Sequence, residues 1–213
     1  QEMADLVGLG YDLAFKYQNP AMILADGIVG QMMEKVVLPP FKPRRTEEEV
    51  RKECPWGTTG KLPNRKRNII TSLALEAEVM ENINLKLQAK YREIEKNEVR
   101  FETHHCEDAD YVLVAFGSIA RICEKAMEMA REEGYKVGVL RPITLFPFPT
   151  NPIKELSKKV KGFLTVEMSA GQMVEDVRLT VNGAVPVEFY GRMGGIVPSA
   201  EEILAALKEK LIK

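Results

Sequence analysis

The feature that most constrains this fold is a series of short apolar segments alternating with helical patterns. Residues 112–140, VLVAFGSIARICEKAMEMAREEGYKVGVL, are typical of a strand, a glycine turn, a helix and a second strand, which is one βαβ unit. FLTVE at 163–167 and PVEFY at 186–190 predict further strands, and EVRFET at 98–103 alternates like an edge strand. Together they predict an α/β domain with a mostly parallel five-stranded sheet, covered by helices on both faces.

Helix-start signals separate these strands. Asn151 followed by Pro152 predicts a capped helix with a proline in its first turn. Ser199 with Glu202 is a capping box that opens the last helix. The remaining helices of the domain are expected over 119–133 and 172–181.

Three parts precede this domain, which we place at 98–213. Residues 1–38 contain a helix that Asn19-Pro20 should end, and then AMILAD, predicted as a buried strand without a sheet of its own. Residues 39–71 are rich in proline, glycine and basic side chains and predict an irregular connector. Residues 72–97 predict one long helix.

Leu73, Met80, Leu87 and Ile94 recur every seven residues along this long helix. The stripe needs a partner surface, and its flanks are not consistently charged as in a coiled coil. We therefore expect it to pack across a neighbouring domain.

Basic pairs and triplets stand out in the connector. Arg44-Arg45 and Arg65-Lys66-Arg67 could bind phosphate groups, although charge runs in connectors usually face water. The turn Gly117-Ser118 lies where a nucleotide-binding sheet carries its phosphate loop, yet it has one glycine and no phosphate fingerprint. We expect it only to turn the chain, with Ser118 capping the helix.

Composition limits the class of protein. The net charge of −1 gives no general attraction to nucleic acid or an anionic membrane, and we expect neither as a partner. No segment approaches the about 20 apolar residues of a membrane span. Three separated cysteines form neither a disulfide framework nor an iron–sulfur ligand set, which favours a reduced, cytoplasmic protein. HHCEDAD at 104–110 is expected to be a surface turn and not a metal site.

Five segments, in order, carry a specific resemblance. They are NPAMILADGIVGQMMEKV, DADYVLVAFGSIAR, RPITLFPFP, VEMSAGQMVEDVR and GRMGGIVPSAEEIL. These resemble the alpha subunit of 2-oxoacid:ferredoxin oxidoreductases, most closely the 2-oxoisovalerate type. The domain at 98–213 looks like the three-layer C-terminal domain of the transketolase superfamily, and 1–38 looks like the end of a pyrimidine-binding domain.

The resemblance implies an enzyme that oxidatively decarboxylates a 2-oxoacid to an acyl-CoA. It implies thiamine diphosphate and iron–sulfur clusters in the holoenzyme, bound mainly by other subunits or by parts outside this chain. It also implies beta, gamma and ferredoxin-like partner subunits and ferredoxin as electron acceptor. The family's catalytic glutamate lies in a part that should precede residue 1. We therefore expect no catalytic, cofactor or metal residue here, and no turnover by this chain alone.

What remains should build interfaces, and loops after strands are where open α/β sheets place contacts. The candidate subunit-interface residues are Asp26, Gly27, Gln31, Glu34, Glu167, Gly171, Gln172 and Arg192. GRMGG at 191–195 could alternatively form an anion-binding loop beside its arginine. A stand-alone Rossmann-like module for a nucleotide or coenzyme A is the alternative function, and a homodimer is a further expectation for the orphaned N-terminal strand.

Overall fold

The computed structural model describes residues 1–41, 43–58, 60, 63–64 and 66–212. The chain forms two compact units. The first unit comprises Gln1–Ala21 and Glu34–Lys90, and the second comprises Met22–Met33 and the chain from Tyr91 onward. We describe each unit separately, and the second one carries the candidate site.

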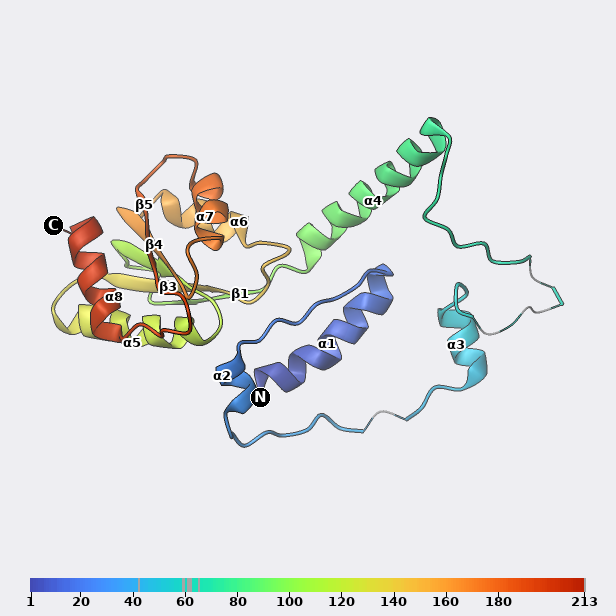
Figure 1. Cartoon of the computed structure of the whole chain (residues 1–213), viewed down its shortest axis with the longest axis horizontal. Coiled ribbons are helices and arrows are strands. Elements are labelled where there is room, and N and C mark those ends of the chain that lie inside the picture. Colours follow the sequence, from blue (N-terminus) through green and yellow to red (C-terminus); the bar gives the residue numbers. More distant parts are fainter. Residues whose placement is uncertain (42, 59, 61–62, 65, 213) are drawn as a thin grey trace. The chain divides into compact units, whose positions relative to one another are not determined.

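The second unit is built on a five-stranded sheet, coloured green to orange-red in Figure 1. The order is β1-β3-β2-β4-β5, in which β1 pairs antiparallel with β3 and all other pairs are parallel. This confirms the predicted sheet with its antiparallel edge. The strands are β1 Phe101–His104, β2 Tyr111–Val114, β3 Val137–Pro142, β4 Gly162–Glu167 and β5 Val187–Gly191.

Helices cover both faces of the sheet, as predicted. The helices α5 and α8 lie on one face, and α6 and α7 lie on the other (Figure 1). A π-helical turn, η1, continues α8. Their bounds are α5 Ser118–Glu132, α6 Thr150–Ser157, α7 Met173–Val181, α8 Ala200–Leu207 and η1 Lys208–Ile212.

The central strands are apolar on both faces because each face meets a helix layer. Two successive residues of β4 show this. Leu164 packs with α5 and α8 on one face, whereas Phe163 packs with α6 and α7 on the other. Every residue of β4 is buried. This burial explains why the strand sequences are continuous apolar runs instead of alternating ones.

Two predicted helix starts have different outcomes. The capping box before α8 is confirmed, because the backbone N–H of Glu202 donates to Ser199 Oγ over 3.2 Å and the backbone N–H of Ser199 donates to Glu202 Oε2 over 2.8 Å. The cap at Asn151 is wrong, because α6 begins at Thr150 after Pro149. Pro152 then falls at the third helical position, where its absent N–H needs no partner within the helix.

In the first unit, α1 spans Glu2–Tyr17 and ends where Asn19-Pro20 predicted. Its C-terminal neighbour Gln18 adopts a left-handed conformation with φ 47°. A second helix, α3 at Glu47–Glu53, begins with a capping box at Thr46 that we did not predict. Trp56 packs against Phe15 of α1, with ring centroids 5.9 Å apart.

The predicted strand AMILAD is wrong. Residues 21–26 form no strand, and the short helix α2 at Gly27–Gln31 follows them. A strand is defined by hydrogen bonds to a neighbouring strand, and within the described residues no strand lies outside the sheet of the second unit. An apolar run alone therefore does not produce one here.

The long helix α4 spans Ala77–Asn97, so its predicted start at residue 72 is wrong. Leu73 lies outside the helix with 70% of its surface exposed, and Ile94 is the buried member of the predicted stripe. In the connector, Arg45 forms an exposed ion pair with Glu53, while Arg65 lies outside the described residues.

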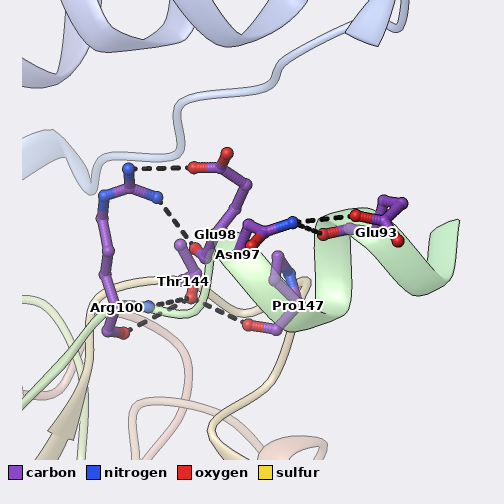
Figure 2. Close-up of polar contacts among 6 residues, drawn as sticks. All are labelled: Glu93, Asn97, Glu98, Arg100, Thr144 and Pro147. Carbon is purple, nitrogen blue, oxygen red and sulfur yellow. Dashed lines mark hydrogen bonds and ion pairs between the residues drawn. The ribbon is translucent and has the colours of Figure 1, made fainter. Parts of the chain in front are cut away.

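Polar contacts tie the end of α4 to the sheet domain (Figure 2). Glu98 is buried, and its carboxylate lies 3.1 Å from the Arg100 guanidinium. The backbone N–H of Arg100 donates to Thr144 Oγ1 over 3.0 Å, and that hydroxyl donates to the carbonyl of Pro147 over 2.8 Å. These bonds join the end of α4 to the loop after β3, which fixes the entry to edge strand β1.

None of the helices in the described ranges is long and apolar enough to span a membrane.

Candidate functional site at the carboxyl edge of the sheet

The carboxyl ends of β2 and β4 lie side by side in the sheet, and the chain leaves them in opposite directions. After β2 it runs through α5 to β3, whereas after β4 it runs through α7 to β5 on the other side. Such a reversal is the position where open α/β sheets place ligands and contacts. The loops at residues 115–118 and 168–172 therefore define the candidate site.

The loop after β2 carries a contact from a distant part of the chain. The Ser118 hydroxyl donates a hydrogen bond to Asp26 Oδ2, across 92 residues of sequence. The other carboxylate oxygen of Asp26 accepts from the backbone N–H of Val29 over 2.8 Å and so caps α2. Ser118 does not cap its own helix as expected. Gly117 is the N-cap of α5, with φ 63°, and the Ser118 hydroxyl donates to Asp26 instead.

These bonds define the electrostatics of Asp26. The hydrogen bond from Ser118, and then the one from the Val29 amide, lower the pKa of the Asp26 carboxyl from its ordinary value of 3.8. Both donors stabilise the ionised form. The loop after β2 thus holds a carboxylate of its own chain at the start of α5, where a helix N-terminus favours negative charge.

The loop after β4 is organised by Glu167, which is buried at 3% exposure. Its carboxylate accepts the backbone N–H groups of Gln172 and Met173 over 3.1 Å each, and that of Val174 over 2.9 Å. The Ser169 hydroxyl donates to the same carboxylate over 3.1 Å. Glu167 therefore caps α7, and its acceptor capacity is used inside the loop.

Arg192 follows β5 and is also engaged within the chain. Its backbone N–H donates to the carbonyl of Glu167 over 3.2 Å, and its guanidinium lies 2.6 Å from Glu202 Oε1. A hydrogen bond with the Tyr190 side chain, followed by the Glu202 charge, raises the pKa of Arg192. The guanidinium that an anion-binding GRMGG loop would use is thus paired with the capping glutamate of α8.

The other predicted interface residues lie in three places. Gly27 and Gln31 are the first and last residues of α2, and Glu34 lies in the first unit. Gly171, at φ 108°, and exposed Gln172 belong to the turn that Glu167 caps. The structure thus brings Glu167, Gly171 and Gln172 together and links Arg192 to them through the backbone.

Two side chains that matter at this edge are absent from our predicted site. Ser118 was expected only as a helix cap, and Ser169 was not singled out. A serine in the loop that follows a predicted strand is a signal for a turn. The partner of Ser118 could not be found this way, because no local pattern connects residues 26 and 118.

The described residues do not fit a metal or iron–sulfur cluster. Cys106 and Cys123 belong to core clusters on opposite faces of the sheet, and burial raises the pKa of Cys106 to about 11. Within these ranges no three His, Cys, Asp or Glu side chains are grouped to hold a metal ion. The hydrogen bonds and ion pairs described above for Asp26, Glu167 and Arg192 are made within the chain.

Comparisons with known proteins agree with this architecture. Residues 109–203 match the family model for pyruvate:ferredoxin oxidoreductase core domain II. Ketoisovalerate oxidoreductase subunit VorB of Methanothermobacter marburgensis is 44% identical over 209 residues, covering 98% of this chain and 57% of that protein. 2-Oxoglutarate synthase subunit KorA of Methanocaldococcus jannaschii is 30% identical over 224 residues, covering 97% of this chain and 60% of that protein.

Among solved structures, the 2-oxoglutarate:ferredoxin oxidoreductase from Magnetococcus marinus is similar, with a TM-score of 0.57 and 22% identity. The match covers 64% of this chain and 24% of that one, and it shows a shared fold. The chain spans less than two thirds of the length of each of these relatives.

Proposed function

We propose that this chain belongs to the 2-oxoacid:ferredoxin oxidoreductase subunits and forms part of the alpha subunit of a 2-oxoisovalerate:ferredoxin oxidoreductase, because it is similar to such subunits. The assembled enzyme would oxidatively decarboxylate a branched 2-oxoacid and form an acyl-CoA. The observation that carries this proposal is 44% identity to a ketoisovalerate oxidoreductase subunit along 98% of the chain. Identity of that extent includes both compact units.

This part of the subunit serves assembly and interfaces instead of the chemical step. In support, three charged groups form hydrogen bonds or ion pairs within the chain, namely those of Asp26, Glu167 and Arg192. A general acid or base needs a free position beside the substrate. These three groups are better suited to holding the loops of a contact surface in place. In this proposal the four predicted parts of the chain, residues 1–38, 39–71, 72–97 and 98–213, link neighbouring subunits.

The cofactors belong to the assembled enzyme in this proposal. Thiamine diphosphate and iron–sulfur clusters would be held by other subunits or by parts outside this chain. The separate, buried cysteines support that assignment for the clusters. Free thiols also fit a reducing, cytoplasmic compartment, which we include in the proposal.

The partners would be beta, gamma and ferredoxin-like subunits, with ferredoxin accepting the electrons. We place the contact surface at the carboxyl edge, where Gln31 and Gln172 are exposed. Co-expression of the tagged chain with these subunits tests the assignment. We expect them to co-purify, and we expect Gln172→Arg to weaken capture because a new cation must be buried there. Recovery of the wild-type chain alone would overturn the proposal.

The alternative function is a nucleotide or coenzyme A module, favoured by the glycine turn at the switch point of the sheet. Asp26 opposes it, since a carboxylate already lies at that turn. Thermal shifts with AMP and coenzyme A separate the two functions. A ligand present at a hundredfold excess over its Kd would stabilise the fold by about 2.7 kcal/mol. Such a shift would support the alternative, and no shift would support the subunit assignment.

A further inference from the structure

Residues 22–33 occupy an unusual place in the chain. They belong to the compact unit of the sheet, although the segments on both sides of them belong to the first unit. The chain therefore leaves its first unit, contributes one extended stretch and α2 to the second, and returns. A segment with such a route needs a specific attachment, because its two ends lead elsewhere.

Apolar packing provides part of that attachment, through half-buried Val29 and through Ile23, which is 37% exposed, while other apolar side chains of the segment face solvent. Met22 is 81% exposed, Leu24 is 70% exposed and Met33 is fully exposed. Burial of apolar surface contributes in proportion to the area removed from water, so these side chains contribute little. The specific polar part of the attachment is the long-range hydrogen bond that the Ser118 hydroxyl donates to Asp26.

The two carboxylate oxygens of Asp26 accept hydrogen bonds from two different parts of the chain. One carboxylate oxygen caps α2 through Val29 N–H, while the other accepts from Ser118 in the first turn of α5. The same carboxylate thus orders the segment locally and holds it to the sheet. Hydrogen bonds to an ionised acceptor are about twice as strong as neutral ones.

We propose that residues 22–33 form a strap across the β2–α5 turn, fastened by the hydrogen bond between Ser118 and Asp26. The strap gives this turn an internal carboxylate at the switch point of the sheet. The inference concerns the chain itself and does not depend on the proposed enzyme.

Hydrogen exchange of the full chain tests the strap through three backbone amides. Val29 donates to Asp26 Oδ1, while Gly30 and Met32 donate to the carbonyls of Asp26 and Ile28. In Ser118→Ala, whose backbone can still form α5 because Gly117 is the N-cap, we expect these amides to exchange about tenfold faster. Exchange within the sheet should stay unchanged.

Two further variants complete the experiment. Ser157→Ala removes a hydroxyl that donates to the Lys154 carbonyl at the end of α6, and it should leave the strap amides unchanged. Ser118→Thr keeps the fastening hydroxyl and should preserve protection. Wild-type exchange rates in Ser118→Ala would overturn the proposal, as would a loss of protection in Ser118→Thr equal to that in Ser118→Ala.

Discussion

At the residue scale, carboxylates at the carboxyl edge act as helix caps. Glu167 binds three consecutive backbone N–H groups of α7, and Asp26 caps α2 while accepting from Ser118. Backbone N–H groups at a helix start have no partner within the helix, so each such bond removes an unsatisfied donor. Because Glu167 is buried, a variant without its carboxylate would leave backbone N–H groups without a hydrogen-bond partner and would lower the stability of the fold.

Glu167→Gln tests the role of this cap. The amide would present an NH₂ group to at least one of the three backbone donors, and we expect a loss of about 2 to 3 kcal/mol in the free energy of unfolding. Urea denaturation followed by circular dichroism measures it. Glu155→Gln is the matched control, because that carboxylate is exposed and forms an ion pair with exposed Lys158 at the end of the same helix. Equal stability of both variants would contradict the assignment.

Thr165 is a buried polar residue that, unlike Glu167, lacks hydrogen-bond partners for its side chain among the described residues. It is fully buried in β4, and its hydroxyl has no hydrogen-bond partner in the part of the chain that the structure describes. Thr165→Val replaces the hydroxyl by a methyl group, so we expect a gain of about 1 kcal/mol in unfolding free energy. Thr165→Ser keeps the hydroxyl and should lose stability. Destabilisation by valine in the same urea experiment would show that the hydroxyl has a partner.

The Asp26 carboxyl provides a prediction about pH. Its pKa is lowered in the folded chain, first by Ser118, so its contribution to stability is full above pH 3.8 and is lost as the pH falls through the lowered pKa. Carbon-13 NMR should show an Asp26 midpoint below 3.8 in the wild type. In Ser118→Ala the midpoint should move up toward 3.8. An unchanged midpoint would contradict the assigned cause.

At the element scale, the sequence predicted the sheet well because each central strand is buried on both faces. Residues 111–114 and 163–166 are mostly apolar for that physical reason, and both lie in strands. AMILAD has the same composition but forms no strand, since pairing depends on a neighbour that local pattern does not show. The contact of Ser118 with Asp26 was unpredictable for a similar reason.

The end of β5 packs closely on the loop after β4, which gives an element-scale prediction. A Cβ built on Gly191 would lie 2.4 Å from the backbone oxygen of Ser169 and 2.4 Å from the Phe189 ring. Gly191→Ala should therefore cost about 1 to 3 kcal/mol, because backbone atoms must move. In Gly27→Ala a Cβ meets nothing within 4 Å, so stability should hold. Equal free energies of unfolding for Gly191→Ala and Gly27→Ala in chemical denaturation would contradict this packing.

At the scale of the whole molecule, sequence similarity and structure support the proposed role in one subunit of an oxidoreductase. The sheet unit has helices on both faces and a carboxyl edge whose named charged groups are bonded within the chain. Sequence similarity to 2-oxoacid oxidoreductase subunits extends over nearly the whole chain. We therefore propose that this chain serves assembly and that the chemical step belongs to other parts of the enzyme.

The central claim is tested most directly by an activity assay of the purified chain with 2-oxoisovalerate, thiamine diphosphate, coenzyme A and a viologen acceptor. We expect no viologen reduction above the enzyme-free blank for the chain alone. We expect reduction that depends on 2-oxoisovalerate when the complete assembly is assayed in the same buffer. Turnover by the chain alone would show that the chemical step belongs to this chain.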